Sequence, residues 1–200
     1  MLDRVQITTL RNGATVVSVA EADAESVAVG IWVAAGGRHE RAALSGASHF
    51  LEHMLFKGTA TRSALEISRA IEGRGGYLNA FTQEESTCYY VRLPYEYLSA
   101  GVDVLTDMYL NAELKPDDVA RERDVILEEI KMYQDLPQHL VQERLQEGMF
   151  KDHALGLPLS GSEKTLSKMT RETLLRYRER AYTRSEEHTS ELQSRADIVC

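Results

Sequence analysis

The chain of 200 residues contains two cysteines, four prolines and no long uncharged apolar run. Two cysteines are too few for a disulfide framework and lack metal-ligand spacing, so we expect Cys88 to be a buried strand residue. A membrane-spanning helix needs about 18 or more apolar residues in succession, and the first residues carry no apolar leader segment. The sequence therefore predicts no membrane partner, and a bacterial cytoplasmic location is the default expectation.

Positive charge is also scarce. The chain has 23 Lys and Arg against 31 Asp and Glu, with a formal net charge of -8 and no run of basic residues. This balance argues against nucleic acid as a partner. The hydrophobic content of 43% is ordinary for a globular protein, and the length suits one domain.

Short β-rich runs at residues 5–10 and 15–19 flank Asn12-Gly13, a strong hairpin signal. Further strands are predicted over residues 26–33, 77–82 and 87–93. Helices are predicted over residues 43–56, from the capping Ser63 to 73, and over 95–110, 116–135, 137–150 and 171–182. Strand groups interrupted by long helices favour an α+β fold, with a largely antiparallel sheet covered by helices.

The pentapeptide His49-Phe50-Leu51-Glu52-His53 offers two candidate metal ligands and a candidate general base. It reads as HxxEH, the inverse of the HExxH zinc-peptidase signature. On a helix, His53 lies about 40° from His49 and Glu52 about 60° to the other side, so the three polar groups share one face. Coincidental surface or core histidines remain the alternative, because a catalytic zinc ion usually takes three protein ligands.

The predicted helix at 116–135 offers a third ligand. Glu122 and Glu129 lie in the middle of an apolar stripe. The stripe consists of Val119, Val125, Ile126, Ile130, Met132 and Tyr133. An unpaired buried carboxylate is costly, so these two are expected to be neutralised, to bind a metal or to pair with arginines at the sheet edge. Glu128 is expected to face solvent.

These segments together resemble the pitrilysin, insulinase and mitochondrial processing peptidase family of inverted zinc peptidases. The likeness rests on HFLEH, on ERDVILEEI with Glu129 76 residues after His53, and on GGYLNAFT, and it spans residues 6–183. The resemblance implies that His49, His53 and Glu129 bind one zinc ion. It also implies that Glu52 is the catalytic base and that Glu122 is a carboxylate supporting the site.

The function that the resemblance implies is zinc-dependent endopeptidase activity on peptides or unfolded polypeptide segments. Zinc would lower the pKa of a bound water, and Glu52 would carry its proton to the leaving amine. The alternatives are a non-catalytic core or regulatory subunit of the same family, or an inactive zinc-binding fragment. Because the chain keeps the complete motif, we expect the parent protein to be an enzyme, while this chain alone is poorly active or inactive.

The segment at residues 75–82 resembles the family's edge strand, to which an extended substrate adds by backbone pairing. An inner strand is the alternative. The expected substrate-binding residues are Asn79, Ala80, Phe81, Thr82 and, after the scissile bond, Phe56. Phe56 is otherwise a core aromatic.

Mitochondrial processing peptidases recognise a substrate arginine with a pair of acidic residues downstream of the third ligand. The matching positions here hold His139 and Glu143, so an arginine preference is not expected. The other histidines, at 39, 153 and 188, have no partner at ligand spacing, and surface or structural roles are expected for them.

Residues 184–200 read RSEEHTSELQSRADIVC, without helical or strand periodicity and without likeness to the family. One permitted coding sequence for residues 184–194 is that of a common sequencing adapter. We therefore interpret 184–200 as a non-native tail and 1–183 as an N-terminal zinc peptidase domain, truncated before its last strands. The resemblance implies a second homologous half-domain, either fused or on a separate chain, including a second copy in a homodimer.

Overall fold

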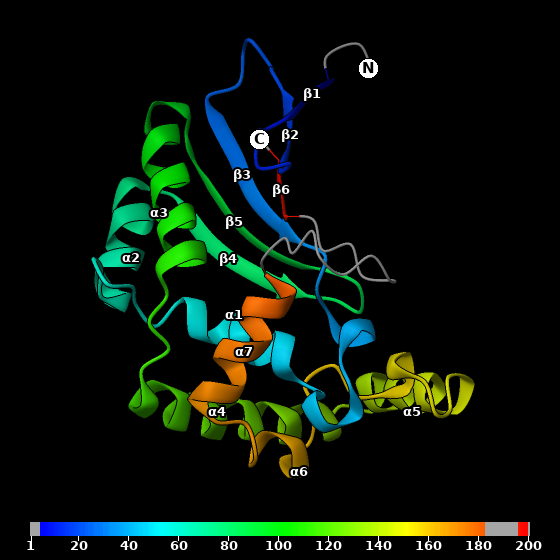
Figure 1. The fold of residues 1–200 in the computed structure, drawn as a ribbon. Coiled ribbons are helices and arrows are strands. Elements are labelled where there is room, and N and C mark those ends of the chain that lie inside the picture. Colours follow the sequence, from blue (N-terminus) through cyan, green and yellow to red (C-terminus); the bar gives the residue numbers. More distant parts are fainter. Residues whose placement is uncertain (1–4, 183–195, 200) are drawn as a thin grey trace.

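The computed structural model describes residues 5–182 and 196–199 and shows one sheet with helices gathered on one side and at one end (Figure 1). The first two strands, β1 (Val5–Thr9) and β2 (Thr15–Val19), pair antiparallel. Gly13 lies in the turn between them with a φ of 76°, a conformation that glycine adopts without strain. The predicted Asn-Gly hairpin is confirmed.

The sheet has six strands in the order β1-β2-β6-β3-β5-β4. The remaining strands are β3 (Ser26–Val33), β4 (Tyr77–Thr82), β5 (Thr87–Pro94) and β6 (Ala196–Val199). All pairs are antiparallel except β2 with β6. The α+β fold with a largely antiparallel sheet is therefore confirmed, and β4 lies at an edge, as predicted.

Strand β6 was not expected, because residues 184–200 show no strand periodicity. It pairs with β2 on one side and β3 on the other, through main-chain contacts that do not depend on a particular side-chain pattern. Residues 183–195 and 200 lie outside the described residues. The adapter origin of the tail stays a prediction.

The α-helices of the described part follow the predicted order. They are α1 (Ala47–Leu55), α2 (Ala64–Ile71), α3 (Leu98–Asn111), α4 (Pro116–Gln134), α5 (Pro137–Met149), α6 (Glu163–Leu166) and α7 (Arg171–Ala181). Short 3-10 turns occupy residues 37–39, 42–44, 72–74, 95–97 and 154–156. The short helix α6 was not predicted.

Helix α1 lies at the centre of the fold, in contact with β4, α4 and α7 (Figure 1). Its apolar side chains Phe50, Leu51, Met54 and Leu55 are fully buried. Burying a side chain of this size stabilises the fold by roughly 1.5–3 kcal/mol. The packing of one face of α1 therefore holds its polar face in a defined orientation.

Helix α1 begins at residue 47 rather than at the predicted 43. Gly46 has a φ of 93°, which interrupts the helical backbone after the separate turn at 42–44. Buried Glu40 accepts hydrogen bonds from the amides of Gly46 at 2.7 Å and Ser48 at 2.6 Å. Its carboxylate thus satisfies amides at the helix start that lack an intrahelical partner.

The predicted apolar stripe of α4 is too wide. Val119 and Ile126 are buried, whereas Val125 is 49% exposed and Met132 51% exposed. Helix α4 packs mainly against α1, α5 and α6 at one end of the molecule, so the flanks of its apolar stripe stay in solvent. Expecting these two side chains in the core was wrong.

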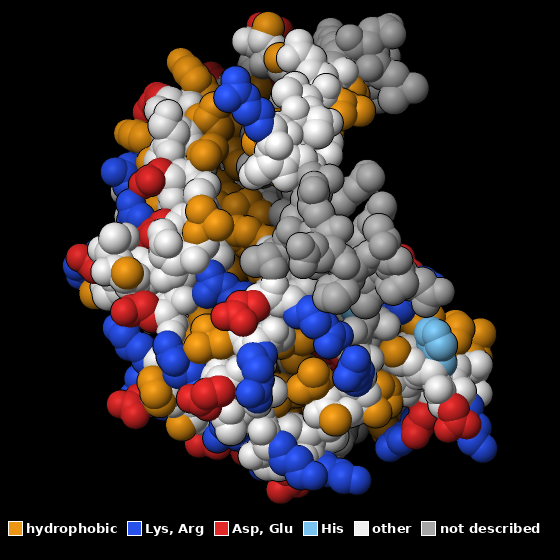
Figure 2. All heavy atoms as spheres, viewed as in Figure 1, with side chains coloured by type: hydrophobic (Ala, Val, Ile, Leu, Met, Phe, Trp, Pro, Cys, Tyr) orange, Lys and Arg blue, Asp and Glu red, His pale blue; other side chains and the backbone are white. Residues whose placement is uncertain are grey.

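The face shown in Figure 2 carries basic side chains scattered among acidic ones over the helical part of the molecule. In the described residues, no helix is long and apolar enough to cross a membrane.

Candidate metal centre

Helix α1 presents His49 and His53 on one face, as the spacing predicted, with ring centroids 4.8 Å apart. Helix α4 lies alongside and supplies Glu129. Its Oε2 atom is 3.7 Å from Nε2 of His49 and 3.5 Å from Nε2 of His53. One ligand-type atom from each of the three residues lies within 4.8 Å of the others. The structure thus brings the three predicted ligands together.

These separations fit a metal ion better than a closed ion pair. A direct N–H···O hydrogen bond is usually about 2.7–3.2 Å long, shorter than either contact with Glu129. In a tetrahedral zinc site with bonds of about 2.0–2.1 Å, neighbouring ligand atoms are roughly 3.4 Å apart. Two imidazole nitrogens and a carboxylate oxygen are also a common donor set for catalytic zinc. The arrangement therefore suits a zinc ion with one further position open.

The two histidines differ in their electrostatic surroundings. Burial, followed by the nearby His53, lowers the pKa of His49 to about 4. For His53, burial also acts to lower the pKa, but contacts with Glu129 and Glu122 outweigh it and raise the value. Contact with His53 in turn lowers the pKa of Glu129, despite partial burial. Neutral His49 and ionised Glu129 are the forms that bind a metal.

Glu122 lies behind His53 rather than among the candidate ligands. Its Oε2 atom is 3.1 Å from Nδ1 of His53, and its Oε1 atom is 2.6 Å from Nζ of Lys57. In metal sites, a hydrogen bond to the imidazole nitrogen that does not bind the metal orients the ring and sets its tautomer. The alternative pairing of Glu122 and Glu129 with arginines is not seen among the described ion pairs; lysine and histidine take that place.

Glu52 lies beside the three candidate ligands and is oriented by β4. The hydroxyl of Thr82 donates a hydrogen bond to its Oε2 atom at 2.5 Å. Burial raises the pKa of Glu52, while the bond from Thr82 and the nearby His53 act in the opposite direction. A carboxylate with a raised pKa is suited to accept and return a proton near neutral pH.

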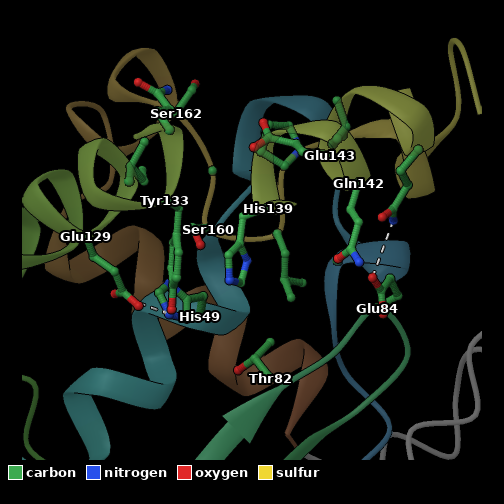
Figure 3. Close-up of a pocket in the computed structure, with 18 of the residues that line it drawn as sticks. His49, Thr82, Glu84, Glu129, Tyr133, His139, Gln142, Glu143, Ser160 and Ser162 are labelled. Carbon is green, nitrogen blue, oxygen red and sulfur yellow. Dashed lines mark hydrogen bonds and ion pairs between the residues drawn. The ribbon is translucent and has the colours of Figure 1, made fainter. Parts of the chain in front are cut away.

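A cleft of about 1030 Å³ opens beside this group (Figure 3). Its lining includes His49, Glu52 and Glu129, and on α5 His139 and Glu143. The segment at residues 154–163 supplies much of the remaining wall. His49, Glu52 and Glu129 therefore face a space large enough for a peptide segment.

The predicted substrate-binding residues divide into two groups. Ala80, Phe81 and Thr82 line the cleft, whereas Asn79 and Phe56 do not. Phe56 packs against the core, with its ring centroid 6.4 Å from that of Tyr89. The contact of each with substrate stays a prediction.

Two residues near the site were missed in the sequence. Lys57 pairs with Glu122, and the hydroxyl of Tyr133 bonds to Glu129. Tyr133 lies four residues after Glu129 on α4, a spacing that brings side chains together on a helix, whereas Lys57 follows the end of α1 and reaches across to α4. The i+4 spacing could have predicted the Tyr133 contact, but the sequence holds no local signal for the pairing of Lys57 with Glu122.

The remaining predictions concern residues away from the site. Cys88 is buried in β5, and exposed Glu128 pairs with Lys131 at 2.7 Å. Nδ1 of His153 accepts a hydrogen bond from the amide of Leu155, a local structural role. Cys200 and His188 lie outside the described residues.

The site combines two histidines from α1 with a carboxylate from α4, and a further carboxylate lies beside them. In an α+β domain, this arrangement is typical of metallopeptidases. The model for Insulinase (Peptidase family M16) matches residues 15–163, and the chain belongs to this family. The chain is 41% identical over 175 residues to the uncharacterized zinc protease YmxG of Bacillus subtilis. It is 45% identical over 176 residues to the uncharacterized zinc protease Rv2782c of Mycobacterium tuberculosis.

Each of these two matches covers 88% of the chain, but 43% and 40% of the respective relative. Solved structures show the same fold. The alignment with a protease from Helicobacter pylori covers 97% of this chain and 45% of the protease chain, with a TM-score of 0.86 and 23% sequence identity. The alignment with a peptidase M16 inactive domain from Pseudomonas fluorescens covers 98% of this chain and 46% of the other chain, with a TM-score of 0.84 and 18% sequence identity. The chain thus spans less than half the length of these relatives.

Proposed function

We propose that the parent protein is a zinc-dependent metalloendopeptidase acting on peptides or unfolded polypeptide segments. In this proposal His49, His53 and Glu129 hold one zinc ion, and Glu52 is the general base. The observation that carries the proposal is the meeting of α1 and α4, which brings three ligand-type atoms within 4.8 Å beside the partly buried carboxylate of Glu52. The names of the zinc protease relatives support the choice of metal.

When bound, zinc supplies a Lewis acid that polarises the scissile carbonyl and lowers the pKa of an attacking water. The residues of the chain supply positioning and proton transfer. Thr82 holds the Glu52 carboxylate, which takes a proton from water and returns it to the leaving amine. Glu122 bonds to Nδ1 of His53 and leaves Nε2 directed toward Glu129. No covalent intermediate is required.

Substrate binding is proposed at the edge strand β4. Within the described sheet β4 pairs with β5 alone, so its other edge is open to main-chain pairing. Ala80, Phe81 and Thr82 place this edge beside the candidate ligands in the cleft. An extended peptide added there would be held by its backbone with little sequence preference. Asn79 would contribute its main chain, and Phe56 would support the pocket after the scissile bond.

A second half-domain is proposed to complete the cleft. The chain covers 40–43% of two zinc protease relatives, which leaves room in each for a second unit of similar size. Such a half, fused or on a separate chain, would close over the open side of the cleft. We therefore expect the isolated chain to bind zinc but to cleave peptides poorly.

A non-catalytic domain of the same family is the second candidate, since the Pseudomonas fluorescens inactive domain shares the fold. The presence of His49, Glu52, His53 and Glu129 together favours the catalytic reading. The test compares the parent-length protein with its Glu52→Gln variant on a quenched fluorescent peptide. We expect zinc content to be unchanged and kcat to fall by roughly 100-fold or more. Equal cleavage by the two proteins would refute the role of Glu52, and no cleavage by either would favour the non-catalytic reading.

A further inference from the structure

We infer that Lys57 is a positioning residue of the metal centre and that it acts through Glu122 to orient the imidazole of His53. The inference rests on the proposed zinc site. Lys57 lies just after the end of α1, its amine contacts Glu122 on α4, and it is not among the residues that line the cleft. Its role is therefore distinct from contact with substrate.

A continuous line of contacts joins Lys57 to the candidate ligands. Nζ of Lys57 is 2.6 Å from Oε1 of Glu122, and the second oxygen of that carboxylate is 3.1 Å from Nδ1 of His53. The far nitrogen of the same ring, Nε2, is 3.5 Å from Glu129. Each oxygen of Glu122 thus has one charged or polar partner. Turning the carboxylate toward one partner would weaken its contact with the other.

The contact with Lys57 is important because the Glu122 carboxylate is buried. The Glu122 side chain is 8% exposed, whereas that of Lys57 is 35% exposed. A carboxylate removed from water needs a partner for each oxygen, and Lys57 is the cation that reaches Oε1. Without that amine, Oε1 has to find water or another donor, and the orientation of the carboxylate toward His53 is no longer determined.

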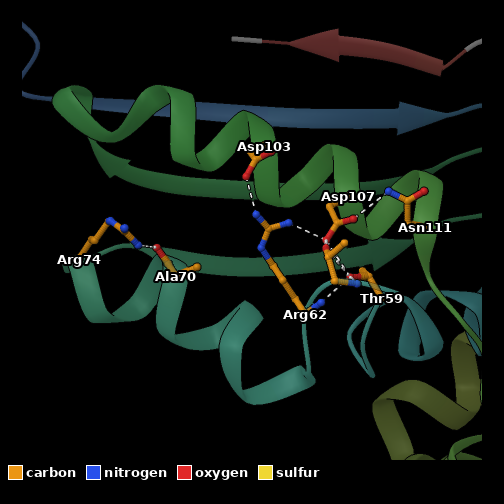
Figure 4. A network of polar contacts seen from close by, with 8 residues as sticks. Thr59, Arg62, Ala70, Arg74, Asp103, Asp107 and Asn111 are labelled. Carbon is orange, nitrogen blue, oxygen red and sulfur yellow. Dashed lines mark hydrogen bonds and ion pairs between the residues drawn. The ribbon is translucent and has the colours of Figure 1, made fainter.

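The backbone on both sides of Lys57 is held in place. Its amide donates a hydrogen bond to the carbonyl of Met54. Two residues further on, Thr59 bonds to the buried Asp107 on α3 (Figure 4). Oδ2 of Asp107 accepts hydrogen bonds from Thr59 at 2.7 Å and from Arg62 at 2.6 Å. The loop after α1 is therefore fixed to a second helix, which limits the freedom of Lys57 compared with an ordinary surface lysine.

Two physical effects of Lys57 on a bound cation have opposite signs. If the lysine acts only through its charge, it repels the metal, and its removal strengthens zinc binding. If it positions Glu122 and His53, its removal weakens zinc binding, because loss of an outer-shell partner typically costs 10–100-fold in affinity. The sign of the change therefore separates the two roles.

The experiment measures the zinc dissociation constant of the 200-residue chain by competition with a chromophoric chelator. We expect Lys57→Met to weaken binding about 10-fold, and Lys57→Arg, which keeps the cation, to restore most of the affinity. The matched control is Lys131→Met, which removes the same charge from an exposed pair with Glu128 on α4. Its affinity should stay within about twofold of the unchanged chain.

A second measurement does not depend on zinc. Nitrogen NMR of the metal-free chain reports which nitrogen of His53 carries the proton, and we expect Lys57→Met to change this ratio while Lys131→Met does not. In a Glu122→Gln background, Lys57→Met should have no further effect on zinc affinity. Lys57→Gln provides the same comparison if the methionine variant does not fold, as judged by circular dichroism.

Unchanged or tighter zinc binding by folded Lys57→Met or Lys57→Gln would overturn the inference while leaving the proposed zinc site intact. Failure of the unchanged chain to bind zinc would instead overturn both, and would do so before any variant is compared. Weaker binding by the neutral variants, with rescue by arginine, supports the positioning role.

Discussion

Nε2 of His53 lies 3.5 Å from Oε2 of Glu129, although the two residues are 76 positions apart in the chain. The contact joins α1 to α4 and turns a local motif into a group of three ligand-type side chains. Since α1 is anchored by its buried apolar face, the geometry of this contact depends on where α4 packs.

Glu129→Gln is expected to lower zinc affinity by at least about 10-fold, because an amide oxygen is a weaker zinc ligand than a carboxylate. Zinc content after dialysis measures the effect. Glu128→Gln is the control, because this neighbour is exposed and pairs with Lys131. Retention of zinc by Glu129→Gln, at the level of the Glu128→Gln control, would show that the third ligand lies elsewhere.

The stability of the chain is expected to depend on pH through Glu40. Burial raises the pKa of this carboxyl to about 7, although the amides of Ser48 and Gly46 act to lower it. The folded state therefore binds the proton more tightly than the unfolded state, whose carboxyl has an ordinary pKa near 4.5. Folding stability from this group is greatest at low pH and falls as pH rises from about 4.5 to about 7, by at most about 3 kcal/mol.

Urea unfolding of the metal-free chain at pH 5, 6, 7 and 8, compared with Glu40→Gln, isolates this contribution. The glutamine cannot titrate, so the stability advantage of the unchanged chain should shrink as the pH rises. A difference that stays constant over this range would show that Glu40 has no raised pKa in the folded state.

Asp107→Ala is expected to destabilise the fold by about 3 kcal/mol, because it removes the shared acceptor of a buried hydroxyl and a partly buried guanidinium. These two groups belong to Thr59 and Arg62. Asp103→Ala removes another carboxylate paired with the same arginine at 2.6 Å, but on a side chain that is 66% exposed. That control should cost less than about 1 kcal/mol. Equal losses in thermal unfolding would count against the special role of the buried carboxylate.

Gly46→Ala is expected to destabilise the start of α1 by more than about 1 kcal/mol. The backbone φ is 93°, and an added Cβ would lie 2.7 Å from the carbonyl oxygen of Ser160. Gly148→Ala is the matched control, because it lies in α5 and the new Cβ would meet nothing within 4 Å beyond its chain neighbours and the nearby backbone of its own helix. That change should stabilise by about 0.5–1 kcal/mol. Chemical denaturation of both variants would reveal whether the two effects have opposite signs.

Much of the fold was accessible from sequence because local signals were strong. Ser63 caps α2 as predicted, where it forms a capping box with Glu66, and Pro116 starts α4 where predicted. Expecting Val125 and Met132 in the core failed for a different reason. Helical periodicity shows which residues share a face, but the width of the buried strip depends on how many neighbours cover the helix.

The sequence by itself determined that His49, Glu52 and His53 share one face of a helix, because 3.6 residues per turn place positions i, i+3 and i+4 together. It also marked Glu129 as an acidic residue in an apolar stripe. Only the tertiary structure decided that Glu129 meets both histidines and that the Lys57 amine supports the carboxylate behind His53. Those contacts join α1 to α4, and their distances follow from the packing of two helices rather than from spacing along either one.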